Sequence, residues 1–283
     1  MTKKMLILTL SLCAATAIAQ DTSKVPQYGW KHTLITSLAL TQVAFTDWAQ
    51  GGENALAYGL ALQGKSVQDE LQTNWTTSYN FAFGQTRLGD QGIRKTDDKI
   101  DLETILAYKL GGNINPYAAA SFKSQFARGY KYDAAGGSIA VSQFFDPAYL
   151  TQSVGAVYTP IPQIKTRLGL AVREVFASDF AALYTDDLAT TAVEKSRVDG
   201  GLESVTEVEW HLDENIVLTS KLELFSAFKT MDQVVVRNDN TIAAKVNKYI
   251  SVNFNVQLIN EPRVSPRTQF KEGIAIGFSY NLL

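Results

Sequence analysis

The feature that most constrains this chain is a two-residue alternation of large apolar side chains with small or polar ones. Its last segment, "GIAIGFSYNLL", places Ile274, Ile276 and Phe278 on one side and Ala275 and Gly277 on the other. Successive side chains of a β-strand point to opposite faces, so the pattern predicts a strand with one apolar face. The alternation recurs along the chain, without a helical period or a run of about 18 apolar residues. The fold class is therefore expected to be all-β.

Twelve such segments are expected to be strands. They span 31–45, 54–67, 71–84, 97–110, 115–127, 149–159, 164–176, 198–212, 216–228, 231–237, 241–259 and 270–283. Short turns alternate with mostly longer connections, and we interpret 238–240 as the short turn after the tenth strand. An even number of strands with this alternation is typical of an outer-membrane barrel, whose sheet must close on itself. We expect a transmembrane antiparallel up-and-down β-barrel.

Two of the short turns predict a register. A two-residue turn at Asp69-Glu70 would place Leu60 opposite Tyr79. A three-residue turn at 213–215, with Asn in the left-handed region, would place Glu207 opposite Lys221. Both registers keep the apolar residues of paired strands on one face, as the alternation requires.

The N-terminus predicts a secretory signal over residues 1–19. Two lysines precede an apolar run over 5–15, and Ala17-Ile18-Ala19 fits the small-x-small cleavage pattern. The alternative is a short buried strand or helix. Cys13 lies inside the signal, and Leu12 stands where a lipidated cysteine needs a small neighbour. The mature chain, a single barrel domain over 20–283, is then free of disulfide and thiolate chemistry.

The charge of the mature chain argues against a nucleic-acid partner. Cleavage would remove two lysines, which leaves 26 − 2 = 24 basic and 28 acidic residues and a formal charge of −4. A protein that binds nucleic acid usually shows a basic patch, and this balance provides none.

Aromatic side chains indicate that the apolar face meets lipid rather than the core of a soluble β-sandwich. If the short turns are periplasmic, one aromatic group lies near the periplasmic ends of its strands and includes Trp30, Trp75, Trp210 and Tyr280. A second group, with Tyr58, Phe81, Phe83, Phe176 and Phe228, lies near the outer ends. Two girdles at the two interfaces are typical of a membrane barrel.

Several segments resemble a family of outer-membrane proteins from Bacteroidetes and their relatives, the domain-of-unknown-function family DUF3078. They are "FTDWAQGGENALAYG" (45–59), "KTDDKIDLETILAYK" (95–109), "SQFARGYKY" (124–132), "SQFFDPAYL" (142–150), "ENIVLTSKLELFSAF" (214–228) and "KVNKYISV" (245–252). The resemblance implies the barrel and its compartment, and no activity. Ala148 replaces an expected glycine and "INEPRV" replaces an expected acidic tract, so the outer loops depart from the family pattern.

Charged residues are expected to line the lumen on three strands. They are Lys165, Arg167, Arg173, Glu203, Glu207, Glu209, His211, Lys221 and Glu223. Such a lining can select a solute in a conduit, or it can form a self-neutralising ladder that holds a narrow barrel shut. The sequence leaves both readings open.

The long connection over 128–148 is the strongest local candidate for a role beyond solubility. Its residues Phe144, Phe145, Asp146 and nearby Tyr149 could fold inward as a constriction, contact a partner or rest on the barrel rim. The acidic loop residues of 95–98 and 186–187 could touch divalent ions or lipopolysaccharide, but solvated charges are the commoner role.

The sequence gives little indication of a catalytic or metal-binding site. A hydrolase needs a nucleophile, a base and an orienting group within reach, and only His32 and His211 are available as histidine bases. No serine stands at an obvious partner position, and no spacing suggests a metal or another cofactor.

We therefore expect an integral barrel in the outer membrane of a Gram-negative bacterium that passively conducts a small polar solute. The first alternative is a closed accessory barrel that binds a membrane partner, and the second is a lipid-modifying enzyme. Expected partners are outer-membrane lipids, lipopolysaccharide and the assembly machinery, although Leu283 stands where that machinery commonly reads an aromatic end. Tyr280 is the nearest aromatic residue.

Overall fold

The computed structural model describes residues 9–10, 28–45, 53–133, 136–187, 190–247 and 249–281, with backbone alone at 9–10 and 278–281. The predicted signal therefore lies outside the described residues except for Thr9 and Leu10. These two form a short strand, β1 (Thr9–Leu10), on the edge of the next strand at Thr41 and Leu40.

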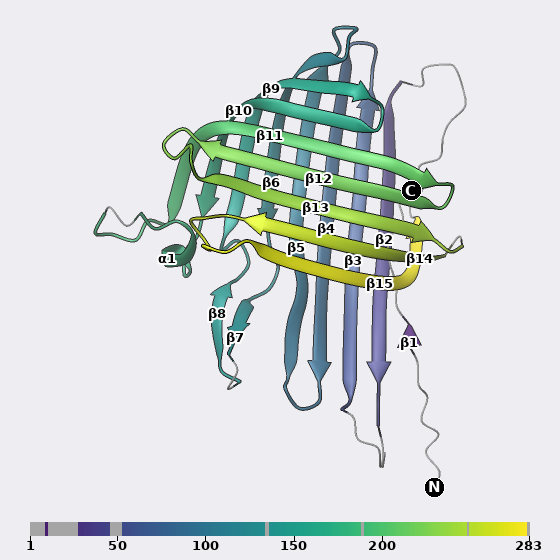
Figure 1. The fold of residues 1–283 in the computed structure, drawn as a ribbon, viewed down its shortest axis with the longest axis vertical. Coiled ribbons are helices and arrows are strands. Elements are labelled where there is room, and N and C mark those ends of the chain that lie inside the picture. Colours follow the sequence, from purple (N-terminus) through teal and green to yellow (C-terminus); the bar gives the residue numbers. More distant parts are fainter. Residues whose placement is uncertain are drawn as a thin grey trace.

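Twelve antiparallel strands form the barrel (Figure 1). They are β2 (Trp30–Val43), β3 (Ala55–Asp69), β4 (Thr73–Leu88), β5 (Ile93–Tyr108), β6 (Ile114–Ser124), β9 (Ala148–Ile161), β10 (Ile164–Phe176), β11 (Ser196–Asp213), β12 (Ile216–Ala227), β13 (Val234–Lys245), β14 (Ile250–Asn260) and β15 (Gln269–Asn281). Each pairs with the next, and β2 pairs with both β3 and β15, so the sheet closes. The predicted all-β barrel of twelve strands is confirmed.

The barrel is flattened into two walls whose strands cross. In Figure 1, β2–β5 run behind β10–β15 at a large angle. The turn between β4 and β5 lies at the bottom of this view, and α1, which follows β10, lies at the left. Among the described residues, the closing seam is the shortest ladder of the barrel. In this part of the chain β15 pairs with β2 from Phe278–Leu38 to Asn281–Ile35, whereas β2 and β3 pair from Trp30–Gln68 to Val43–Ala55.

Two long connections contain structure that the sequence reading left as loop. The segment after β6 holds a separate hairpin, β7 (Gly129–Tyr132) paired with β8 (Ser138–Ser142). The segment after β10 holds a single turn of helix, α1 (Ala181–Tyr184). No helix in the described part of the chain is long and apolar enough to cross a membrane.

The predicted turn at 238–240 is wrong, because β13 runs through it. The Asp239 side chain accepts hydrogen bonds from Asn255 at 2.7 Å and Gln257 at 2.9 Å inside the barrel. The true turn follows at Asn247, whose side-chain oxygen accepts from the backbone N–H groups of Tyr249 (2.8 Å) and Ile250 (2.9 Å). Asparagine residues are common in turns, but here side-chain partners on β14 and Lys99 across the lumen keep an Asn-Asp-Asn run in a strand.

The predicted register of the β3–β4 hairpin is also wrong, whereas its faces are right. Leu60 stands opposite Phe83 rather than Tyr79. Asp69 belongs to the ladder and accepts a hydrogen bond from the Asn74 side chain at 2.7 Å, so the turn moves on to Glu70 and Thr73. The shift is an even number of residues, which preserves the alternation of faces.

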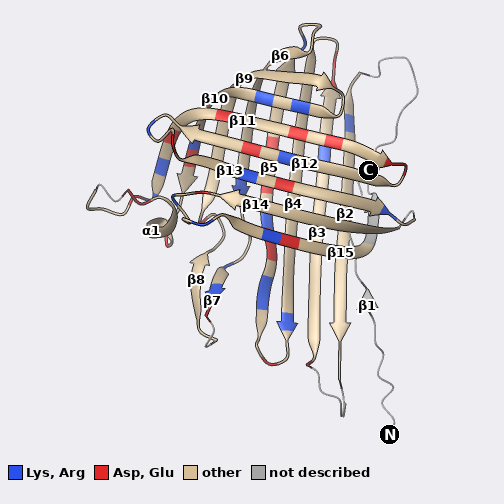
Figure 2. Ribbon diagram, viewed as in Figure 1, with Lys and Arg blue, Asp and Glu red and all other residues tan. Residues whose placement is uncertain are grey.

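The predicted β11–β12 register is confirmed. Glu207 stands opposite Lys221 and Trp210 opposite Leu218. The predicted turn is wrong, because Asp213 pairs with Ile216, an irregularity lies between His211 and Asp213, and Asn215 does not have a positive φ. The outward residues of the wall are exposed and apolar, as at Leu60 (52%), Leu168 (60%) and Ile274 (71%). The inward rows carry the charges that Figure 2 shows along β5 and β10–β13.

Candidate functional site: the lumen

An ion triad joins the two walls at the middle of the lumen. Glu103 on β5 accepts a hydrogen bond from the Arg167 guanidinium of β10 at 2.5 Å, and its other oxygen lies 2.8 Å from the Lys221 ammonium of β12. The Arg167 and Glu103 side chains are only 4% and 7% exposed. One carboxylate thus ties together three strands that lie far apart in the sequence.

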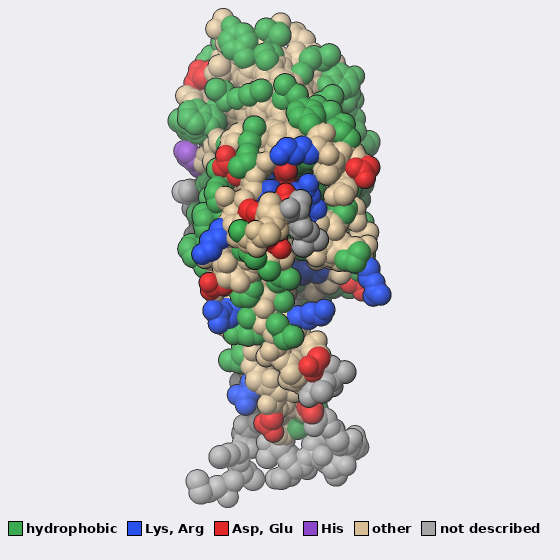
Figure 3. All heavy atoms as spheres, turned by 90° about the vertical axis from the view of Figure 1, so that its left-hand side faces the viewer, with side chains coloured by type: hydrophobic (Ala, Val, Ile, Leu, Met, Phe, Trp, Pro, Cys, Tyr) green, Lys and Arg blue, Asp and Glu red, His purple; other side chains and the backbone are tan. Residues whose placement is uncertain are grey.

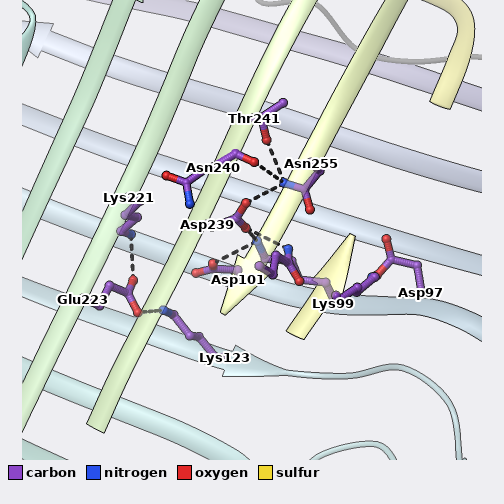
Figure 4. A network of polar contacts seen from close by, with 12 residues as sticks. Asp97, Lys99, Asp101, Lys123, Lys221, Glu223, Asp239, Asn240, Thr241 and Asn255 are labelled. Carbon is purple, nitrogen blue, oxygen red and sulfur yellow. Dashed lines mark hydrogen bonds and ion pairs between the residues drawn. The ribbon is translucent and has the colours of Figure 1, made fainter. Parts of the chain in front are cut away.

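A second carboxylate extends this triad toward the outer end. Glu223 lies 3.1 Å from Lys221 on its own strand and forms an ion pair with Lys123 of β6 on the opposite wall. Figure 4 shows Glu223 between the two ammonium groups. The alternation of cations and anions leaves each charge near an opposite one.

A third group crosses the lumen beside the triad. The Lys99 ammonium of β5 lies 3.3 Å from Asp239 of β13 and 3.6 Å from Asp101 (Figure 4). Further out, the Lys271 ammonium of β15 lies 2.8 Å from the Asp97 carboxylate of β5. These pairs again join the β5 wall to the opposite wall.

Arginines dominate the outer mouth of the lumen. Glu261, in the turn after β14, accepts hydrogen bonds from Arg173 and Arg237, each at 2.9 Å, and Tyr149 lies between these guanidinium groups at 5.0 and 4.8 Å from its ring centroid. Burial alone would raise the pKa of the Glu261 carboxyl, but the two arginines outweigh burial and hold the pKa below its ordinary value of 4.5.

Two small cavities lie among these side chains. One cavity, lined by Glu103, Lys123, Tyr149, Arg173, Glu203 and Glu223 among others, offers about 40 Å³ to the centres of water molecules. Another, at the outer mouth beside Arg263, offers about 20 Å³. A single water needs roughly 10–15 Å³ by this measure, so the first cavity has room for about three waters and the second for about one.

Two small polar side chains are buried on the β2 and β14 side of the barrel. Ser251 of β14 is fully buried and Ser37 of β2 is 4% exposed, while the nearby apolar residue Ile35 is 5% exposed. The ion pairs therefore cross the middle of the lumen, whereas these buried side chains lie near its closing seam.

The structure places the predicted lumen residues on the inner face of the wall, but it separates them into two sets. Arg167, Arg173, Lys221 and Glu223 belong to the ion pairs described above, and Glu203 lines the larger cavity. Lys165, Glu207, Glu209 and His211 lie toward the short-turn ends of β10 and β11, with Lys165 opposite Glu207 in the ladder. Within the described chain, no ion pair within 4.0 Å joins this second set.

Sequence reasoning missed the partners on the opposite wall. Lys99, Glu103 and Lys123 share inward rows of β5 and β6 with Asp97 and Asp101, so the alternation already placed them in the lumen. Which charge meets which across the lumen depends on barrel shape, and no local pattern encodes it.

The loop residues lie on the outside of the rim. Phe145, at φ 58°, stacks on the outward residues Phe122 and Phe176, with ring centroids 5.9 and 6.2 Å apart, and Phe144 lies beside it. The inward constriction is therefore not the arrangement found for these two rings. Asp146 is buried and accepts from the Asp179 N–H at 2.7 Å, whereas Tyr149 alone of the four points into the lumen.

The predicted aromatic girdle is exposed where its side chains are described. Trp30, Trp75 and Trp210 are 44%, 42% and 44% exposed, and the first two lie 5.5 Å apart. The Tyr280 side chain lies outside the described residues. His32 stacks on Trp30 on the outward face, at 5.8 Å, and donates to or accepts from Ser66 at 2.8 Å. No cluster of three metal-ligating side chains occurs in the described ranges.

The chain is similar to several solved membrane barrels. The COG4313 outer membrane channel from Pseudomonas putida F1 is 12% identical with a TM-score of 0.39, over 94% of this chain and 98% of that one. The NanC porin is 9% identical with a TM-score of 0.38, over 87% and 98%. The translocator domain of autotransporter NalP from Neisseria meningitidis is 11% identical with a TM-score of 0.39, over 91% and 89%.

No curated protein sequence matches the chain. A family model does match, over residues 40–130, which run from the outer end of β2 to β7. Its description is "Protein of unknown function (DUF3078)". The resemblance to this family that the sequence motifs indicate is confirmed over that segment.

Proposed function

We propose that this protein is an integral outer-membrane β-barrel of a Gram-negative cell. The support is the closed ladder, which leaves few backbone groups unpaired, together with an outward face of exposed apolar side chains between tryptophans and outer aromatics. Figure 3 shows hydrophobic side chains over the upper part of one face, above charged groups in its middle. Water would disfavour such an apolar belt, whereas lipid favours it.

We further propose that the lumen is closed at rest and that the protein acts as an accessory barrel that binds a membrane partner. The observation that carries this proposal is the Glu103 triad, which spans the lumen and in which the Arg167 and Glu103 side chains are nearly buried and that of Lys221 is 25% exposed. A buried ion pair resists separation, because removing one partner leaves an uncompensated charge in a poorly solvated place. A hydrated ion or solute would have to displace these pairs to pass.

The second candidate is the narrow passive channel for a small polar solute. It is favoured by the polar character of the lumen, which holds charged side chains and cavities for a few waters. Side-chain pairs between walls can also separate without opening the backbone ladder. On this alternative the ion pairs act as a selectivity barrier instead of a plug.

Solute uptake into proteoliposomes separates the two candidates. Vesicles with the wild-type barrel should swell in a small sugar no faster than empty vesicles, and Glu103→Ala should swell faster, since Arg167 and Lys221 then repel each other and draw in water. Thr104→Val is the matched control, because Thr104 is the next residue on β5 and contacts Trp75 and Thr77 on the outward face. Rapid wild-type swelling would favour the channel.

A further inference from the structure

Two guanidinium groups at the outer mouth converge on one carboxylate. Arg173 of β10 and Arg237 of β13 each donate to a different oxygen of Glu261, both at 2.9 Å. Their strands are separated in the sheet by β11 and β12, so the carboxylate joins groups that no ladder brings together. Hydrogen bonds between ionised groups are about twice as strong as neutral ones, and two of them fix the orientation of the carboxylate. The geometry of this mouth therefore suits a carboxylate.

The two arginines have contacts that do not involve Glu261. The Arg173 guanidinium lies over the rings of Tyr149 and Phe225, at 5.0 and 5.6 Å from their centroids, and the Arg237 guanidinium lies over Tyr149 at 4.8 Å. Both rings belong to strands of the barrel, β9 and β12. Aromatic faces attract cations, so these rings hold the guanidinium pair in place whether or not Glu261 is bound.

Glu261 itself belongs to a loop. It follows Asn260, the last residue of β14, and no ladder pair of the described strands β13–β15 includes it. Its backbone carbonyl accepts from the N–H groups of Val264 and Ser265, at 2.9 and 3.0 Å, within the same turn. The Glu261 side chain can therefore leave the arginines without breaking the sheet.

The site borders the two cavities described above. Arg173 lines both of them, and Glu261 lines the one at the outer mouth. The charged residues around that outer cavity are three arginines and two carboxylates, namely Arg173, Arg197, Arg263, Asp199 and Glu261. Loss of Glu261 increases the excess of positive charge. A small anion is then attracted to the space that the Glu261 side chain has vacated.

We propose that Arg173, Arg237 and Tyr149 form a binding site for a small carboxylate ligand at the outer mouth, and that Glu261 is the chain's own occupant of this site. A free carboxylate places its two oxygens where those of Glu261 lie and accepts the same two hydrogen bonds. Guanidinium groups match a planar carboxylate better than a spherical ion such as chloride. The inference goes beyond the proposed accessory barrel and does not require the lumen to be closed.

Glu261 and the ligand compete for the arginines. A group on a short tether acts at an effective concentration of about millimolar order or above. A free carboxylate must exceed this local concentration to bind the wild-type protein. When it does, the Glu261 side chain is released from the mouth together with its loop.

Thermal unfolding of Glu261→Ala in lipid vesicles tests the site, with acetate as the probe. Sodium acetate is compared with sodium chloride at equal ionic strength and neutral pH. At about ten times its dissociation constant, acetate should raise the unfolding midpoint of this variant by about 3–6 °C, because it binds only the folded state. The wild-type midpoint should not rise at the same concentration, since Glu261 already occupies the arginines.

Glu261→Gln is the matched control. It removes the same charge as the alanine variant but still fills the space between the arginines, so acetate should add little to its midpoint. An equal gain in Glu261→Gln or in the wild type would reveal a general anion effect and overturn the inference. A Glu261→Ala barrel that gains nothing from acetate, or that folds in neither salt, would also overturn it. None of these results depends on solute uptake, which tests the closed lumen.

Discussion

Lys221 stands directly opposite Glu207 in the β11–β12 ladder, yet its ammonium lies 2.8 Å from Glu103 on the other wall of the barrel. The side chain therefore reaches across the lumen instead of pairing with its ladder neighbour. If Lys221 pairs with Glu103, ion pairs join the two walls and hold the lumen shut. If Lys221 paired with Glu207, the ion pairs would lie within one wall and leave the lumen open.

Double-mutant cycles should separate these two relationships. Loss of one partner of the nearly buried Glu103–Lys221 pair should cost about 3–5 kcal/mol of unfolding free energy. The coupling between Glu207 and Lys221 should stay below about 1 kcal/mol, as for a solvated pair. Urea unfolding of the barrel in lipid vesicles provides the measurement. Equal couplings for the two pairs would contradict the arrangement.

The neighbouring residues Gly273 and Ile274 test which face meets lipid. Ile274 is 71% exposed on the outward face, whereas a Cβ added to Gly273 meets nothing within 4 Å inside the barrel. Ile274→Lys should destabilise the barrel in bilayers by about 2–4 kcal/mol. Gly273→Lys should cost under about 1 kcal/mol, because its side chain enters open space in the polar lumen opposite Asn255. A larger loss for Gly273→Lys would mean that the faces are reversed.

Glu261 predicts a pH dependence at the outer mouth. Because Arg173 and Arg237 hold its folded pKa below 4.5, the carboxylate contributes stability that is present above the unfolded pKa. This stability is lost as the pH falls through the folded pKa. Glu261→Gln should therefore lower the thermal midpoint at neutral pH, and the difference from wild type should shrink below pH 4.5. A difference that grows in acid would have the wrong sign.

Asn247 predicts where the β13–β14 turn lies. Its side-chain oxygen caps the N–H groups of Tyr249 and Ile250, so Asn247→Ala should cost about 1 kcal/mol of stability. Asn238→Ala removes no such cap, and it should cost less stability than Asn247→Ala. Chemical unfolding of the two variants would compare them, and the reverse order would restore the turn at 238–240.

The sequence was sufficient for the parts of the fold that depend on alternation. Strand number, face assignment and the β11–β12 register follow from side-chain period and one short turn, and Glu207 does stand opposite Lys221. A shift of the strand register by an even number of residues leaves the alternation of faces unchanged, so the pattern does not distinguish Phe83 from Tyr79 as the partner of Leu60. The residue types of Asn238–Asn240 predict a turn, because the sequence around Asp239 does not reveal its partners Asn255 and Lys99 in the lumen.

The site was predictable only in part, for the same reason. Rows of inward charges follow from each strand alone, and Arg167, Lys221 and Glu223 were identified from them. Their partner Glu103 is 64 residues from Arg167 and 118 from Lys221 in the sequence. A contact of this kind depends on which residues of the two walls face each other across the lumen, and no single strand encodes that.

Single-channel recording in planar bilayers tests the closed lumen most directly. The wild-type barrel should show no stable conductance step, and Glu103→Gln should produce steps that favour anions, because Arg167 and Lys221 lose their shared carboxylate. The outward control Thr104→Val should stay silent. A stable wild-type step that Glu103→Gln leaves unchanged would contradict the account, since the triad would then close nothing.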